Sequence, residues 1–114
     1  MQITPAYIEP KIEYKTANHK ILKQYASPLG VNCVTYVKSK SNIGTGFGSL
    51  AQKKNKIKTQ KPKVGVAVTA EGPVGHLVYV EKVLESDLII SEGNYRRGFI
   101  TWRHVPKTLI LGYL

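Results

Sequence analysis

The feature that most constrains the fold is the alternation of apolar and polar residues that begins after Pro62. Runs of β-branched and aromatic residues follow one another, parted only by the short turn segments EGPV, LES, NYR and PK. Such short links suit hairpins and are too short for the crossover that parallel strands need. The pattern predicts a five-stranded antiparallel meander over residues 64–70, 75–83, 87–93, 97–105 and 108–114.

The chain before this alternation has a helical pattern. Thr16 can cap a short helix over residues 16–25, whose apolar residues share one face. After the turn SPLG, Asn32 is a good N-cap for a second helix that runs from residue 33 to about residue 40. Residues 41–62, first glycine-rich and then lysine-rich, are predicted to be mostly loop. The predicted fold class is therefore α+β, with N-terminal helices packed on the sheet.

The length fits one domain. The 114 residues, of which 42% are apolar, can bury a modest core. We divide this single domain, residues 1–114, into an N-terminal segment (1–26) and a core (27–114) with a lysine-rich connector at 51–63. One cysteine cannot form an intramolecular disulfide. No apolar run approaches the length of a membrane span, and the opening MQITPAYIEPK lacks the pattern of a signal peptide.

Positive charge is concentrated in the first half of the chain. The 17 Lys and Arg against 7 Asp and Glu give a net charge of +10, and no acid occurs between Glu13 and Glu71. A field of this sign attracts polyanions of any kind. A small nucleic-acid-binding domain is one alternative, but it requires aromatic residues among the basic ones for base stacking, and only Phe47 lies between Lys38 and Lys63. We expect the connector lysines on the surface: Lys53, Lys54, Lys56, Lys58, Lys61 and Lys63.

Cys33 stands where a nucleophile would be activated, at the predicted start of the second helix. The N–H groups and the positive end of a helix dipole stabilise a thiolate and lower the cysteine pKa from ~8.5. Cysteine catalysis also needs a base, and His76, at the start of the second predicted strand, is the candidate. Taken alone, Cys33 is equally well explained as a small buried apolar residue.

The predicted strand pairing supplies partners for His76. If Val83 lies opposite Asp87, then His76 lies opposite Asn94 and Glu92 occupies the adjacent pair, within side-chain reach. A carboxylate would then orient the imidazole, as in catalytic triads. We expect Glu92 to lie outside the core.

These residues and their order resemble the CHAP family, the cysteine, histidine-dependent amidohydrolases/peptidases. The resemblance rests on SPLGVNCVTYVKSK, PKVGVAV, GHLVYVEKV, IISEGNY and a closing R-x-V…ILGYL, and it covers residues 27–114 without the connector. It implies a papain-like fold and hydrolysis of an amide bond of bacterial peptidoglycan. The enzyme would be an N-acetylmuramoyl-L-alanine amidase or a peptide endopeptidase.

The resemblance also implies roles for individual residues. It makes Cys33 the nucleophile, His76 the base, Glu92 the orienting acid and Asn94 a further polar site residue. We place Asn32 and Gly75 in the oxyanion and substrate-binding part of the site, although the family usually has Gln at the position of Asn32 and an aromatic residue at that of Thr35. We expect no metal or other cofactor, because the acid-free span cannot supply the carboxylates that calcium requires.

The implied setting is phage-related lysis by a monomer. Its partners would be peptidoglycan and, through the connector lysines, anionic wall polymers. It would reside in the host cytoplasm before release to the wall, or in a virion. The alternative is a weakly active or inactive CHAP-like module that binds cell wall within a virion assembly. His19 and His104 find no partners in the pattern, and we expect both on the surface.

Overall fold

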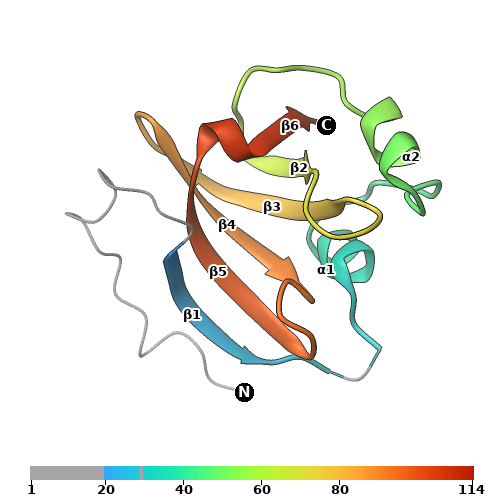
Figure 1. Ribbon diagram of the computed structural model, residues 1–114, viewed down its shortest axis with the longest axis vertical. Helices are drawn as coiled ribbons and strands as arrows, with labels where there is room; N and C mark the ends of the chain where they lie inside the picture. Colours follow the sequence, from blue (N-terminus) through green and yellow to red (C-terminus); the bar gives the residue numbers. More distant parts are fainter. Residues whose placement is uncertain (1–19, 29) are drawn as a thin grey trace.

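The computed structural model describes residues 20–28 and 30–114, which form one antiparallel sheet with two helices beside it (Figure 1). No helix in this part of the chain is long and apolar enough to span a bilayer. The elements are β1 (Lys20–Ala26), α1 (Cys33–Lys40), α2 (Leu50–Asn55), β2 (Gly65–Thr69), β3 (His76–Val83), β4 (Asp87–Gly93), β5 (Phe99–Pro106), the 3-10 turn η3 (Lys107–Leu109) and β6 (Ile110–Tyr113).

The sheet has six strands in the order β1-β5-β4-β3-β2-β6, rather than the predicted five. Strands β2 to β5 form the predicted meander of antiparallel neighbours. The last strand departs from it, because β6 crosses to the free edge of β2 instead of pairing with β5. The α+β class is confirmed, and the prediction of a simple five-stranded meander was wrong.

The sixth strand, β1, replaces a predicted helix. Residues 16–19 of that helix lie outside the described residues, and the remainder pairs antiparallel with β5, with a bulge between Ile21 and Lys23. A short helix here would gain little from propensity alone. Pairing with β5 instead satisfies the backbone groups along the otherwise open edge of that strand.

The first helix, α1, forms as predicted, and its N-cap explains where it begins. The Thr35 N–H donates to Asn32 Oδ1 (2.9 Å), and the Asn32 N–H donates back to Thr35 Oγ1 (2.7 Å). This reciprocal capping box satisfies two groups that a helix end leaves unpaired. The first residue of the helix is therefore Cys33.

The second helix, α2, lies inside the predicted loop. Ser49 and Gln52 form a capping box of the same kind, with the Gln52 N–H donating to Ser49 Oγ (3.1 Å). The spacing S-x-x-Q was present in the sequence as a helix-start signal. The helix is only six residues long, and its contacts with the chain before β3 hold it in place.

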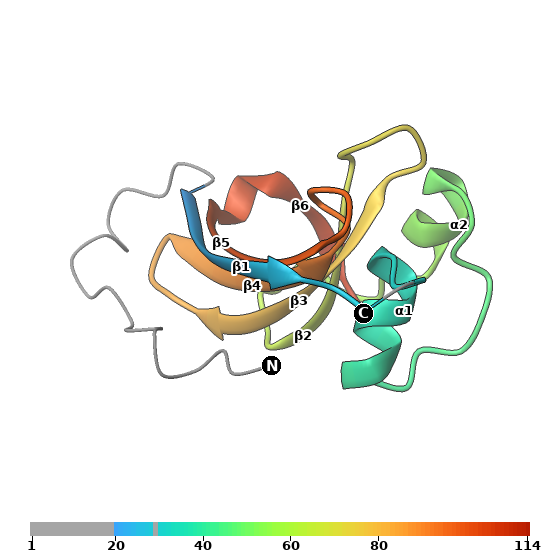
Figure 2. The ribbon, with the colours of Figure 1, turned by 90° about the horizontal axis from the view of Figure 1, so that it is seen from below.

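Apolar side chains on the two faces of the sheet form two small cores. Successive residues of a strand point to opposite faces, so Val66 and Val68 face one core and Ala67 the other. The core on the helix side contains Val37, Phe47, Val66, Val68 and Leu77. The core on the opposite face contains Ala67, Val78, Val80, Leu88, Ile90, Val105 and Tyr113. Seen from below, both helices lie at one end of the sheet (Figure 2).

The expectation that His104 is a surface residue was wrong. Its side chain is fully buried in β5, and its Nε2 lies 3.2 Å from Asp87 Oδ2. A buried imidazole needs a polar partner, and the neighbouring strand supplies one at the start of β4. The other histidine expected on the surface, His19, lies outside the described residues.

The close approach of α1 to β4 requires a glycine at position 93. A Cβ at Gly93 would lie 2.8 Å from the Asn32 carbonyl oxygen and 2.8 Å from Tyr36 Cβ. We predict that Gly93→Ala lowers the free energy of unfolding by ~1 to 3 kcal/mol, because the helix must shift away from the sheet. Urea denaturation measures the change.

Gly48→Ala is the matched control for this substitution. A Cβ at Gly48 meets only the end of the flexible Gln52 side chain, at 3.1 Å, and the change in stability should stay within ~0.5 kcal/mol. Equal losses in the two variants would contradict the close-packing explanation.

Candidate active site

Helix α1 lies at one end of the sheet (Figure 1), and the three residues predicted to act together belong to elements that meet there. Cys33 is the first residue of α1, His76 is the first residue of β3, and Glu92 is the last but one of β4. Helix α1 packs against β3 and β4, which run in opposite directions. The start of β3 and the end of β4 therefore reach the nucleophile together.

Close contacts connect these side chains. Cys33 and His76 border the same cavity, and each shifts the pKa of the other towards its charged form. His76 Nε2 lies 2.9 Å from Glu92 Oε1. Because Nε2 is held by Glu92, Nδ1 is the ring nitrogen left for other contacts of the imidazole. The side chains thus stand in the order nucleophile, base and acid, as nucleophilic catalysis by cysteine requires.

The strand register that brings His76 to Glu92 depends on a β-bulge. At the hairpin Val83 pairs with Leu88, not with Asp87 as predicted. A bulge between Val80 and Lys82 then shifts the register by one residue, and Tyr79 pairs with Ser91. The predicted register was wrong at the turn, and the bulge restores it beside the site.

Glu92 is fully buried, against our expectation, and it is held by a residue that the sequence analysis gave no role. Arg103 Nε donates to Glu92 Oε2 and Arg103 Nη2 donates to Glu92 Oε1, both at 2.7 Å. On its other side the guanidinium binds Glu71 Oε2 and Oε1, at 3.0 and 2.9 Å. Fork-shaped pairing of this kind fixes a carboxylate in position as well as neutralising it.

The sequence feature that could have identified Arg103 as a buried residue is its position in the alternation of β5. Arg103 and Val105 point to the same face, and Val105 lies in the core opposite the helices. On β4, Glu92 is likewise in phase with the core residue Ile90. The Arg103–Glu92 pair therefore continues an apolar core, which explains why both side chains are fully buried. The exposed ring of Tyr95 lies over the guanidinium, 3.6 Å from its Cζ.

The contacts of Cys33 and His76 favour a thiolate and an imidazolium. Burial opposes ionisation of Cys33, but hydrogen bonds from His76 and the Leu77 backbone, with the positive charges of His76 and Lys53, hold its pKa below the ordinary value. Burial also opposes protonation of His76, yet hydrogen bonds with Cys33 and Glu92 raise its pKa to about 9. Each group therefore favours the charged form of the other, as in a thiolate–imidazolium ion pair.

One connector lysine is not on the surface, contrary to expectation. Lys53 lies in α2 with only 1% of its surface exposed, and its Nζ donates to the Val74 carbonyl oxygen (2.9 Å). The bond ties α2 to the loop before His76. Among the residues described, no carboxylate forms a salt bridge with Lys53, so its positive charge acts on the thiolate nearby. The remaining connector lysines are exposed or half-buried.

The other predicted site residues border the same cavity, of about 360 Å³, beside Cys33 and His76. Gly75 has a φ of 75°, and a Cβ there would come within 2.7 Å of Leu50 Cδ1, so only glycine suits this position. Asn94 also has a positive φ, and its Oδ1 accepts from the Gly98 N–H (2.9 Å). Asn94 thus shapes the turn after β4, and within the described residues no hydrogen bond joins it to His76. Asn32 borders the cavity from the helix cap.

Residues 20–28 and 30–114 contain no group of three or more His, Cys, Asp or Glu placed to hold a metal ion. Comparison of the chain with protein-family models, with curated proteins and with solved structures finds no match.

We predict that Cys33 reacts with iodoacetamide at a lower pH than a free cysteine does. The midpoint of the rate against pH should lie below ~8.5 in the native protein, because His76 stabilises the thiolate. In His76→Gln the midpoint should rise by about one unit or more. Mass spectrometry counts the adduct without ambiguity, since Cys33 is the sole cysteine. The urea-unfolded protein supplies the reference, and equal midpoints in native and unfolded protein would refute the ion pair.

A second pair of variants separates the two carboxylates that bind Arg103. Glu92→Gln breaks a fully buried pair and should cost ~3 kcal/mol or more of unfolding free energy, whereas Glu71→Gln, whose side chain is 25% exposed, should cost less. Only Glu92 touches His76, so only Glu92→Gln should raise the alkylation midpoint of Cys33. If Glu71→Gln raises it equally, the orienting role does not belong to Glu92 alone.

Proposed function

We propose that this chain is a cysteine hydrolase of the CHAP type that cleaves an amide bond of bacterial peptidoglycan. One observation carries the proposal: Cys33, at a helix start, borders the same cavity as His76, whose ring contacts the buried carboxylate of Glu92. The α+β sheet with α1 at one end is compatible with the papain-like fold that the resemblance implies. The choice of peptidoglycan rests on that resemblance.

The residues suggest the following mechanism. The Cys33 thiolate attacks the carbonyl carbon, and a tetrahedral oxyanion forms. The C–N bond then breaks as the His76 imidazolium gives its proton to the leaving amine. Neutral His76 next takes a proton from water, which attacks the thioester and frees the acid and the thiol. Glu92 holds the imidazole in one orientation throughout, and Arg103 holds Glu92.

The helix start offers a place for the oxyanion. Helix geometry gives the Cys33 N–H no acceptor within α1, whereas the N–H of Thr35 is already bonded to Asn32 Oδ1. The Cys33 N–H is thus the backbone donor nearest to the nucleophile. Asn32 can add its side-chain Nδ2, which has no hydrogen-bond partner among the described residues.

The same capping box favours a second candidate function. Asn32 Oδ1 is committed to the helix cap, which restricts how its amide can turn towards an oxyanion. Losing one oxyanion donor costs ~10² to 10³ in rate. The second candidate is therefore a weakly active or inactive CHAP-like module that binds the cell wall.

We predict that the protein clears a suspension of purified peptidoglycan and that Cys33→Ser and His76→Gln each reduce the rate by about a thousand-fold or more. Mass spectrometry of the released fragments identifies the new chain ends and so the bond that is cut. Circular dichroism must show that both variants remain folded.

Two further arms distinguish the alternatives. The rate should persist in EDTA, because no step proposed here uses a metal. Sedimentation of the protein with peptidoglycan measures binding separately from cleavage. Binding by wild type and Cys33→Ser without cleavage by either would favour the module, and full activity of Cys33→Ser would exclude the cysteine mechanism.

A further inference from the structure

A second cavity, of about 480 Å³, lies at the other end of α1 from Cys33. Cys33 is the first residue of the helix, whereas Ser41, its C-cap, lines this cavity. The helix has eight residues, which corresponds to a length of about 12 Å. The cavity shares no lining residue with the one beside Cys33 and His76. It plays no part in the mechanism proposed above.

This cavity combines an apolar floor with a positively charged rim. Its floor includes Val66 and Phe47 of the helix-side core and Leu114, which packs against that core. Three connector lysines complete the lining: Lys56, Lys58 and Lys63. None of the residues that line it is acidic. The cavity therefore suits a ligand with both a negative group and a compact body.

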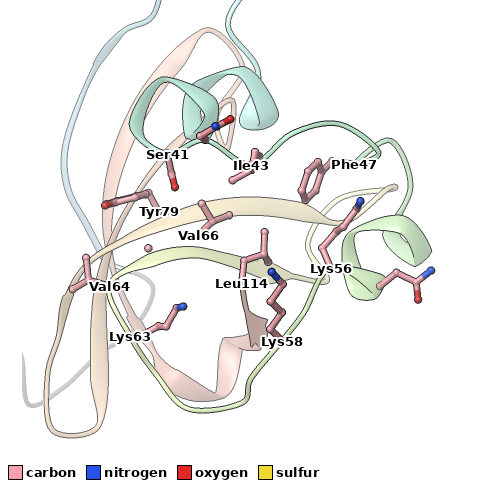
Figure 3. A pocket seen from close by; sticks show the side chains of 13 residues that line it. Ser41, Ile43, Phe47, Lys56, Lys58, Lys63, Val64, Val66, Tyr79 and Leu114 are labelled. Atoms are coloured by element: carbon pink, nitrogen blue, oxygen red, sulfur yellow. The ribbon is translucent and has the colours of Figure 1, made fainter.

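Within residues 20–28 and 30–114, no carboxylate neutralises the three lysines. In the described part of the chain, none of them forms a salt bridge. Figure 3 shows the side chains of Lys58 and Lys63 extending towards the space between them, with Lys56 farther along the same side, near Phe47. The Lys56 ammonium lies 5.4 Å from the centre of the Phe47 ring, which holds it near the cavity. Bound anionic oxygens would relieve the mutual repulsion of these charges.

These features favour an organic phosphate over a nucleic acid. A volume of this size suits a small molecule or one unit of a polymer. Non-specific single-strand binding uses exposed aromatic faces on which bases stack. The Phe47 side chain is only 4% exposed, and Tyr79 is half-buried, with the Lys40 ammonium 4.9 Å from its ring centre. The pocket thus lacks an open stacking platform.

We propose that this pocket binds the phosphate of an alditol or sugar phosphate, with the carbon body against the apolar floor. The source is either a free phosphate ester or a phosphodiester unit of an anionic wall polymer. The site goes beyond the proposed function, because it is separate from Cys33 and needs no catalysis to operate. With a polymer as the ligand, the pocket would hold the protein at the wall.

Backbone amide shifts of the ¹⁵N-labelled chain of residues 1–114 test the proposal. Titration with glycerol 3-phosphate should shift the amides of Ser41, Gly65 and Val66 saturably, and neutral glycerol should not. Poly(glycerol phosphate) should shift the same amides and compete with the monomer. If only the monomer shifts these amides, the pocket is a small-molecule site. If the polymer binds more tightly than the monomer, it is a site for a wall polymer.

Two double variants that remove the same charge distinguish binding in the pocket from attraction by the overall positive charge of the protein. Lys58→Gln with Lys63→Gln should weaken binding by about ten-fold or more. Lys54→Gln with Lys61→Gln removes the same charge from exposed lysines outside the cavity and should change it by less than about two-fold. Cys33→Ala should bind as wild type does, whatever the outcome of the lysis assay.

Three results would overturn the proposal. Equal weakening by the two double variants would mean that net charge alone attracts the phosphate. The absence of saturable shifts with both phosphate probes would mean that the pocket does not bind them. Tight binding of a single-stranded oligonucleotide that glycerol 3-phosphate cannot displace would assign the basic surface to nucleic acid.

Discussion

The buried pairing of Arg103 with Glu92 is the interaction on which the arrangement of the site depends. Burying charges costs free energy unless opposite charges lie close by, and the described residues around this pair include groups of both signs. With Cys33 as thiolate, the positive groups are Arg103, His76 and Lys53, and the negative ones are Glu92, Glu71 and Cys33. Among the described residues these groups supply three charges of each sign. Burial opposes protonation of His76, and the contacts and negative charges of Cys33 and Glu92 are the physical reason for its raised pKa.

These charged groups can lie close together because two glycines let the helices approach the sheet and the loop before β3. Gly93 admits the start of α1 against the end of β4, next to Glu92. Gly75 admits Leu50 and Lys53 of α2 against the residue before His76. Gly93 therefore sets how closely the helix of the nucleophile approaches β4, and Gly75 sets how closely α2 approaches the residue before the base. A side chain at either position would displace a helix, and with it a charge that the network needs.

The sequence predicted the parts of this structure that depend on local chemistry. The Asn32 cap located the start of α1, and period-two alternation located β2 to β5, since both signals act within a few residues. The sequence did not predict the parts of the structure that depend on contacts between residues far apart in the chain. Residues 20–26 pair with β5, and Lys53 is buried by packing on the loop before β3. The bulge between Val80 and Lys82 shows the same limit, because the turn residues alone implied another register.

The connector lysines show how one run of like charge is divided by the fold. A run of lysines is usually a solvated surface, and Lys54 and Lys61 are exposed in that way. Helix α2 turns Lys53 inward, where its charge acts on Cys33. The chain that follows carries Lys56, Lys58 and Lys63 to the cavity at the far end of α1. Since screening at physiological salt leaves a range of only ~8 Å, these groups act on different neighbours, and the net charge of +10 is not one undivided patch.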